Sequence, residues 1–282
     1  ISYFLEHNVL LRRFTLSVGV LANYNSALNE GINFYPGIDA SYRIGDNVRL
    51  YGSWNRALRM PTFTDLYYEG KTNKGNPDLK PEESEAFEVG LKYNTYFLRA
   101  HIAGFYRKGK NMIDWVKEKP EDIWESQNLT KVDNLGFETN LSLLPRELGN
   151  ERFFIRKIEL GYAFIHQDKD SEGYISNYAL DYLKHKFTAQ LSHSIWKGFS
   201  ATWYVRWQDR AGSYTKYENL KPAYEEPYAP YCLVDMKVNW EYQRLNLYAE
   251  LNNLLNSTYY DLGNIPQPGI WFKAGFRYSF KY

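Results

Sequence analysis

The sequence of 282 residues has a single cysteine, Cys232, and lacks any run of 18 apolar residues. One cysteine excludes an internal disulfide framework and a zinc site built on cysteines. The missing apolar run excludes a membrane-spanning helix. Basic and acidic residues number 34 and 33, for a formal net charge of +1. A balance of this kind gives no sign of a nucleic-acid surface, and we expect no nucleic-acid partner.

Patterns that would indicate catalysis or a bound cofactor are missing as well. The five histidines lie in separate segments, and none has metal-ligand spacing to another. No local pattern indicates a nucleophile elbow. We therefore expect a protein that is not an enzyme and has no cofactor.

Aromatic residues, in contrast, are abundant, with 26 Tyr, 16 Phe and 8 Trp. Many lie in stretches where apolar and polar residues alternate, which is the period of a β-strand with two different faces. Near the end of the chain, Phe272, Ala274 and Phe276 share one face, whereas Lys273 and Arg277 share the other. The alternation predicts an all-β protein.

About thirteen such segments occur, each roughly 9–12 residues long, the length that crosses a bilayer when a strand is tilted. The connections between them alternate between short and long. Short turns at one surface and long loops at the other are typical of an antiparallel transmembrane β-barrel. The segments start near residues 1, 12, 34, 47, 84, 97, 133, 154, 184, 198, 231, 244 and 269, and the long connections cover 57–81, 110–132, 167–183, 208–230 and 256–268.

Charged residues within the predicted strands decide which face meets lipid. Examples are Glu88, Lys92, Glu138 and Lys237. A basic residue at the bilayer midplane costs about 2–4 kcal/mol on the lipid face, so these side chains must face the lumen. An odd strand number does not fit a bacterial single-chain barrel, and the sequence starts within a strand pattern without a signal peptide. We therefore interpret residues 1–282 as one portion of a larger barrel.

Several motifs point to a family. The segment Asn55–Glu83 reads NRALRMPTFTDLYYEGKTNKGNPDLKPEE. It resembles a signature of TonB-dependent outer-membrane receptors, in which a strand end is followed by Pro-Thr-Phe-x-Asp-Leu-Tyr and Gly-Asn-Pro-Asp-Leu-Lys-Pro-Glu. The stretches Gly136–Glu138, Leu251–Leu255 and Pro268–Phe280 are similar to other strands of that family, the last to its closing strand. The resemblance covers nearly the whole chain.

This resemblance implies an antiparallel transmembrane β-barrel, of which the chain would form the C-terminal ~13 strands of a 22-strand type, with the plug domain absent. It implies the outer membrane of a Gram-negative bacterium and TonB-dependent uptake of a scarce ligand such as a ferric siderophore or cobalamin. The implied partners are outer-membrane lipid, a small-molecule ligand, TonB and the plug through the missing N-terminal part, and the barrel-assembly machinery through the C-terminal strand.

Aromatic residues in the long connections are the candidate ligand-binding residues. Aromatic side chains give a large contact area at low entropic cost and suit planar chelates or corrinoids. Counting strands backwards from the closing strand places the 57–83 connection outside the cell. The candidates are Tyr67, Tyr68, Trp115, Trp124, Tyr174, Tyr214 and Tyr217.

One segment is a weak calcium candidate. Asp168, Asp170 and Glu172, followed by Gly173, resemble the first half of a calcium loop. The place of the bidentate glutamate is taken by Ala179, so the segment is no EF-hand, and no metal site is assigned.

Other functions stay open. The alternative is a passive porin or a surface adhesin, and the stretch at 76–82 discriminates, since it has no role in a simple porin. An outer-membrane enzyme is disfavoured by the absence of a Ser/His or Asp/His pair within one loop.

Overall fold

The structure is a computed structural model in which the strands account for most of the chain. In the described part of the chain, the helices are the one-turn α1 (Phe63–Tyr67) and a 3-10 turn at Pro145–Leu148. No helix among the described residues is long and apolar enough to cross a membrane. The residues described are 1–26, 31–119, 121–148, 153–170, 173–176, 182–218, 221–263 and 265–280.

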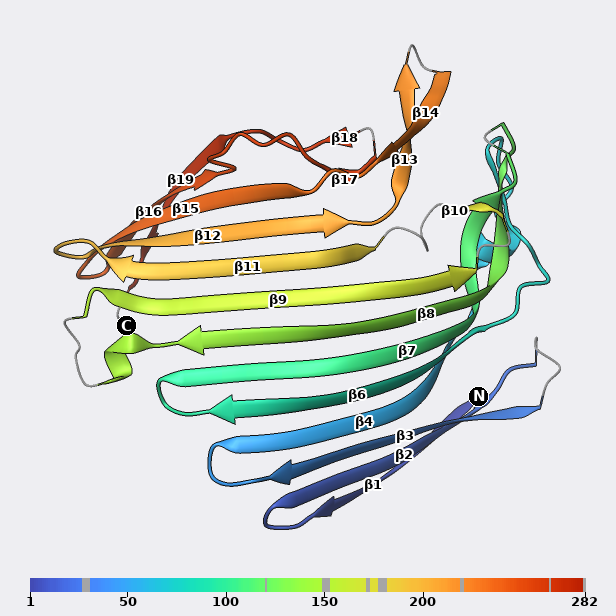
Figure 1. Ribbon diagram of the computed structural model, residues 1–282, viewed down its shortest axis with the longest axis horizontal. Coiled ribbons are helices and arrows are strands. Elements are labelled where there is room, and N and C mark those ends of the chain that lie inside the picture. Colours follow the sequence, from blue (N-terminus) through green and yellow to red (C-terminus); the bar gives the residue numbers. More distant parts are fainter. Residues whose placement is uncertain are drawn as a thin grey trace. The chain divides into compact units, whose positions relative to one another are not determined.

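Thirteen strands of the described chain follow one another in one hydrogen-bonded ladder, each beside the next (Figure 1). The all-β fold and the predicted number of long strands are thereby confirmed. All predicted strand starts but one lie within two residues of those observed. The ladder consists of β1 (Ser2–Leu10), β2 (Phe14–Tyr24), β3 (Ile32–Arg43), β4 (Val48–Arg59), β6 (Glu82–Asn94), β7 (Leu98–Lys117), β8 (Trp124–Leu143), β9 (Ile155–Asp170), β11 (Leu183–Ser194), β12 (Phe199–Arg210), β15 (Tyr231–Tyr242), β16 (Leu245–Asn252) and β19 (Trp271–Tyr278).

Short strands give structure to the long connections. Two of them add to the ladder: β5 pairs in parallel with β8, and β10 pairs antiparallel with β7. The others form the hairpins β13–β14 and β17–β18. Their bounds are β5 (Asn73–Lys74), β10 (Ile175–Ser176), β13 (Ser213–Glu218), β14 (Lys221–Pro227), β17 (Tyr260–Leu262) and β18 (Ile265–Pro266).

The predicted loop at 110–132 is wrong. Strand β7 continues to Lys117 and β8 already begins at Trp124, so each has 20 residues, and β9 has 16. At their ends these extensions pair with the short strands β10 and β5, where Ile175 lies opposite Lys117 and Asn73 opposite Trp124. Polar residues interrupt the alternation there, and for that reason the pattern alone ended the strands too early.

Contacts divide the chain into two compact units. The first consists of Ile1–Lys92, Ile102–Phe137 and Ile165–Tyr182. The second consists of Tyr93–His101, Glu138–Phe164 and Leu183–Tyr282. That residues 1–282 form a single barrel portion stays a prediction.

In the second unit, the register of β15, β16 and β19 aligns charged residues across one face. Lys237, Glu250 and Lys273 lie side by side, with Glu250 2.7 Å from the Lys237 ammonium and 2.5 Å from that of Lys273. The neighbouring row, which includes Phe272, points to the other face, and the Phe272 side chain is exposed. The predicted two-faced pattern of the closing strand is therefore present in the structure.

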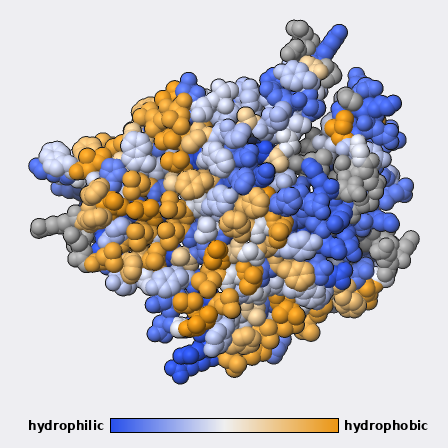
Figure 2. Space-filling view, viewed as in Figure 1, coloured by the Kyte–Doolittle hydropathy of each residue, from blue (hydrophilic) through white to orange (hydrophobic). Residues whose placement is uncertain are grey.

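In the first unit, charged and apolar side chains also lie on opposite faces of the strands. The Lys92 ammonium lies 4.6 Å from the centre of the Tyr51 ring, and that ring covers Gly90, where a Cβ would come within 2.5 Å of it. On the opposite face, Phe87 contacts Trp54, and Val89 is 59% exposed. Hydrophobic residues form broad areas on the visible surface (Figure 2). Exposed apolar faces of strands this long are what lipid covers in a transmembrane barrel.

Candidate functional site

The connection between β4 and β6 contains the Pro-Thr-Phe-x-Asp-Leu-Tyr motif and folds into the capped helix α1. Thr62 is the N-cap: its hydroxyl accepts a hydrogen bond from the backbone N–H of Asp65 at 3.1 Å. The Asp65 carboxylate accepts in return from the backbone N–H of Thr62 at 2.9 Å. This capping box satisfies donors that a five-residue helix leaves unpaired. The motif therefore defines a rigid turn directly after the end of β4.

The same connection is fixed to strand β8. Ser126, which is fully buried, donates from its hydroxyl to the backbone carbonyl of Asp65 at 2.5 Å. The Asn128 side chain binds Lys80 twice, accepting from its N–H at 2.9 Å and donating to its carbonyl at 3.0 Å. Leu79, from the Asn-Pro-Asp-Leu stretch, is buried. The second half of the signature thus anchors the connection to the extended β7–β8 hairpin.

A buried carboxylate joins three of these elements. Glu82, at the start of β6, accepts two hydrogen bonds of 2.5 Å from the Arg59 guanidinium at the end of β4. It also accepts from the backbone N–H of Ile113 in β7 at 2.8 Å. Bidentate pairs with arginine are among the stronger polar contacts in proteins. The pair closes the base of the connection and holds it against β7.

Three of the predicted aromatic residues, Tyr68, Trp115 and Trp124, lie in or beside this connection in the first unit. Tyr68 meets Trp115 edge to face, with ring centres 6.3 Å apart. The Lys117 ammonium lies 4.5 Å from the centre of the Trp124 ring. Because Trp115 and Trp124 belong to β7 and β8, the assignment of these two residues to a loop is wrong. Both are partly buried by their neighbours.

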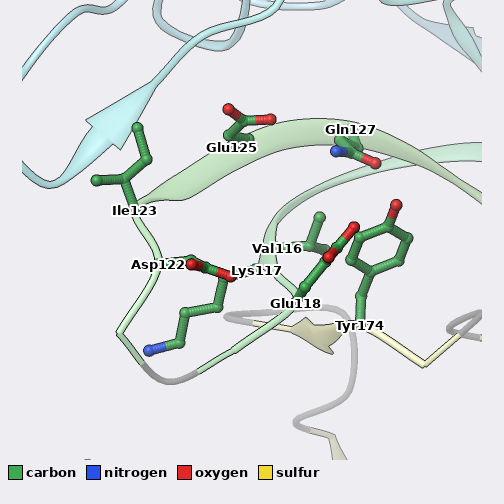
Figure 3. Close-up of a pocket in the computed structure, with 8 residues that line it drawn as sticks. All are labelled: Val116, Lys117, Glu118, Asp122, Ile123, Glu125, Gln127 and Tyr174. Carbon is green, nitrogen blue, oxygen red and sulfur yellow. The ribbon is translucent and has the colours of Figure 1, made fainter.

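Tyr174, just before β10, lines a hollow of about 270 Å³ beside the end of the β7–β8 hairpin (Figure 3). The hollow also presents Gln127 and three carboxylates, Glu118, Asp122 and Glu125. No local sequence pattern indicates this arrangement, since these residues are far from Tyr174 along the chain and come together through the pairing of β10 with β7.

Tyr67 is the most exposed of the candidate residues in this unit. Tyr67 is 63% exposed and contacts Phe63, one turn earlier in α1, at a ring-centre distance of 6.2 Å. Phe63 is even more exposed. The connection therefore presents two adjacent aromatic rings to solvent. The helix that carries them is held to β8 by the hydrogen bond from Ser126 to Asp65.

In the second unit, Tyr214 on β13 lies in a cluster of tyrosines. Its ring centre is 5.1 Å from that of Tyr228 and 5.6 Å from that of Tyr260. The Tyr214 hydroxyl donates to Glu226 at 3.0 Å, and Lys216 pairs with the same carboxylate at 2.9 Å. Tyr214 thus packs against other tyrosines and stabilises the β13–β14 hairpin.

The charges in this hairpin stabilise each other. The hydrogen bond from Lys216, followed by that from Tyr214, lowers the pKa of Glu226. The hydrogen bond to Glu226 raises the pKa of Lys216. Tyr217, the last candidate, is 55% exposed on the same strand.

The structure describes only part of the weak calcium candidate. Asp168 lies in β9 rather than in a loop, which corrects its predicted position, and its carboxylate is 3.8 Å from the Lys131 ammonium. Asp170 ends the same strand, and its side chain, like Glu172, lies outside the described residues. Within the part of the chain that is described, no group of three or more His, Cys, Asp or Glu is arranged to hold a metal ion.

The long strand ladder, its exposed apolar face and its structured long connections define a transmembrane β-barrel protein. A family model described as "TonB dependent receptor-like, beta-barrel" matches residues 2–254, and the chain belongs to this family. The family consists of outer-membrane receptors of Gram-negative bacteria that transport rather than catalyse, as the sequence predicted.

Individual relatives agree. The chain is 28% identical over 134 residues to the vitamin B12 transporter BtuB of Vibrio vulnificus, covering 43% of this chain and 21% of that protein. It is 22% identical over 297 residues to the ferrienterobactin receptor of Escherichia coli, covering 95% of this chain and 38% of that protein. The chain thus spans well under half the length of these relatives.

Solved structures share the fold. The siderophore receptor PirA of Pseudomonas aeruginosa superposes with a TM-score of 0.70 at 17% identity, over 99% of this chain and 46% of that one. The copper transporter OprC gives a TM-score of 0.73 at 16% identity, over 99% of this chain and 47% of that one.

Proposed function

We propose that the protein to which this chain belongs is an outer-membrane receptor for TonB-dependent uptake of a scarce ligand, a ferric siderophore or cobalamin. The family match over residues 2–254 carries the proposal. It is supported by the printed functions of two relatives, vitamin B12 transport and ferrienterobactin reception.

Within this proposal, TonB and a plug domain are partners of the receptor. Outer-membrane lipid covers the apolar face that includes Phe87 and Val89. The barrel-assembly machinery recognises the closing strand β19, because an edge strand is a template for pairing.

The ligand-contacting residues are proposed to be the exposed aromatics of the long connections, Tyr67 and Tyr68 on one unit and Tyr217 on the other. Their exposure supports this role. The other ring residues stabilise these surfaces by packing. Trp115 and Tyr214 contact other rings, and the Lys117 ammonium lies over Trp124. Tyr174 contributes the wall of the hollow beside β10. Rigid aromatic surfaces lose little entropy when a ligand binds.

Uptake by cells tests the function. A strain that lacks its own receptors and expresses the full-length protein should accumulate either a ferric siderophore or cobalamin, and only when TonB is present. Equal accumulation with and without TonB would favour a passive porin. Surface attachment without accumulation of either ligand would favour an adhesin.

Substitution of exposed tyrosines tests the site. Tyr67→Ala and Tyr217→Ala should each weaken ligand binding about tenfold, because each removes an aromatic contact. Tyr96→Ala is the matched control, since Tyr96 is equally exposed but lies in the short turn between β6 and β7. Unchanged binding in both variants would remove these residues from the site. Deleting the connection is less informative, because Thr72 and Asn73 pair with Trp124.

A labelling experiment tests the orientation. Lys71, in the β4–β6 connection, should react with a membrane-impermeant amine reagent in whole cells. Lys197, in the short turn between β11 and β12, should react only after the outer membrane is opened. The reverse pattern would invert the proposed orientation.

A further inference from the structure

The lipid-facing side of the first unit ends in charged residues next to the long connection. Along β4, β6 and β7 this face presents exposed apolar side chains, among them Leu50, Val89 and Ile102. Toward the connection, the same face continues with Trp54, which contacts Phe87. Tryptophan at the end of an apolar band is typical of the boundary between hydrocarbon and headgroups.

An open hollow of about 340 Å³ lies on this face at that boundary. It is lined by Trp54 and Arg56 of β4, by Glu83 and Glu85 of β6, and by residues of β7 and β3. The β7 residues are Lys108 and Lys110, and the β3 residue is Pro36. The hollow thus combines the Trp54 ring with several charged side chains, next to the apolar surface that lipid covers.

The carboxylates of the hollow are already engaged. Glu83 forms an ion pair with Arg56 at 3.4 Å. Glu85 accepts a hydrogen bond of 2.8 Å from the indole N–H of Trp54. Among the described residues, neither Lys108 nor Lys110 takes part in an ion pair or a cation–π contact. The three basic and two acidic side chains of the hollow leave it one positive charge in excess, and both lysine ammonium groups can donate to an anion from outside the chain.

We propose that this hollow binds the phosphate of a membrane lipid headgroup, with Lys108 and Lys110 as its ligands. The lipid's acyl chains lie along the exposed apolar residues of β4, β6 and β7, and its phosphate meets the lysines. An amphipathic lipid matches both parts of the surface, whereas a free anion would use the lysines alone. Basic residues close to an anionic lipid surface each strengthen binding by about fivefold.

Titration of the purified protein in neutral detergent tests the proposal, with binding measured by native mass spectrometry. The probes are phosphatidic acid and a diacylglycerol with the same acyl chains, which lacks the phosphate. The unaltered protein should bind phosphatidic acid at least tenfold more tightly than diacylglycerol. The double variant K108Q/K110Q should lose at least tenfold of its affinity for phosphatidic acid and keep its affinity for diacylglycerol.

Two further variants make the result decisive. K71Q/K74Q removes the same charge from exposed positions of the β4–β6 connection and should bind phosphatidic acid as the unaltered protein does. K108R/K110R keeps both charges and should retain most of the affinity, which separates a charge effect from a folding defect. Equal affinity of K108Q/K110Q and the unaltered protein would overturn the proposal. Inorganic phosphate that competes as strongly as the lipid would overturn the lipid assignment.

Discussion

Tyr248 of β16 lies across Gly275 of β19, and a Cβ at Gly275 would lie only 2.5 Å from the Tyr248 hydroxyl oxygen. The Lys237 ammonium of β15 lies 4.6 Å from the centre of the same ring. In the first unit Tyr51 covers Gly90 in the same way, and the ammonium of Lys92, on the same strand as Gly90, lies 4.6 Å from the centre of that ring. At such a glycine, the neighbouring aromatic ring fills the space that a side chain would occupy.

Gly275→Ala should therefore destabilise the protein by about 1–3 kcal/mol, because the new methyl group overlaps the Tyr248 ring. Urea unfolding followed by tryptophan fluorescence measures the loss. Gly45→Ala is the control, since no atom lies within 4 Å of a Cβ built there. Equal midpoints for the two variants would show that the ring moves aside without cost.

Glu82→Gln should destabilise the base of the β4–β6 connection by about 1.5–3 kcal/mol, because it weakens the charge-assisted hydrogen bonds from Arg59. The measurement is the rate of protease cleavage at Lys71 together with urea unfolding. Glu83→Gln serves as the comparison, because its pair with Arg56 is exposed and should contribute less than about 1 kcal/mol. An equal effect of both substitutions would contradict the structural role of Glu82.

The two faces of β19 can be separated with spin labels. A label at position 272 should be accessible to oxygen dissolved in lipid, whereas one at 273 should be accessible to a water-soluble relaxation agent. Phe272 is aligned with Leu251, and Lys273 with Glu250, so the register fixes opposite faces. Equal water access at both positions would mean that the strand is shifted by one residue.

The β13–β14 hairpin should lose order in acid. The pKa of Glu226 is lowered from 4.5, so its stabilising interaction is complete above the unfolded value and is lost as the pH falls through the lower folded pKa. The pKa of Lys216 is raised from 10.5, so its contribution is complete below that value and is lost as the pH rises through the folded pKa.

Amide hydrogen exchange of residues 213–218 at several pH values measures this effect, corrected for the intrinsic pH dependence of exchange. Glu226→Gln should abolish the acid-dependent change, whereas Glu225→Gln should leave it in place. An acid-dependent change that persists in Glu226→Gln would assign it to another group.

The period of two in the sequence was sufficient to predict the all-β fold, the thirteen-strand ladder and the face of each residue in β19. Lys273 and Phe272 illustrate why: alternation is a local property, and lipid tolerates only one of the two faces. The Thr62–Asp65 capping box is local in the same way, since its partners are three residues apart.

The extensions of β7 and β8 and the surroundings of the candidate residues were decided by tertiary structure. Trp124 lies opposite Asn73 of β5, and Val116 and Lys117, which follow Trp115, lie opposite β10, so strands distant in sequence supply backbone partners at the ends of β7 and β8. Likewise, only the packing shows that Tyr214 is covered by Tyr228 and Tyr260 while Tyr217 stays exposed. Pairing and burial depend on residues far apart in the chain, and a local pattern holds no information about which of them meet.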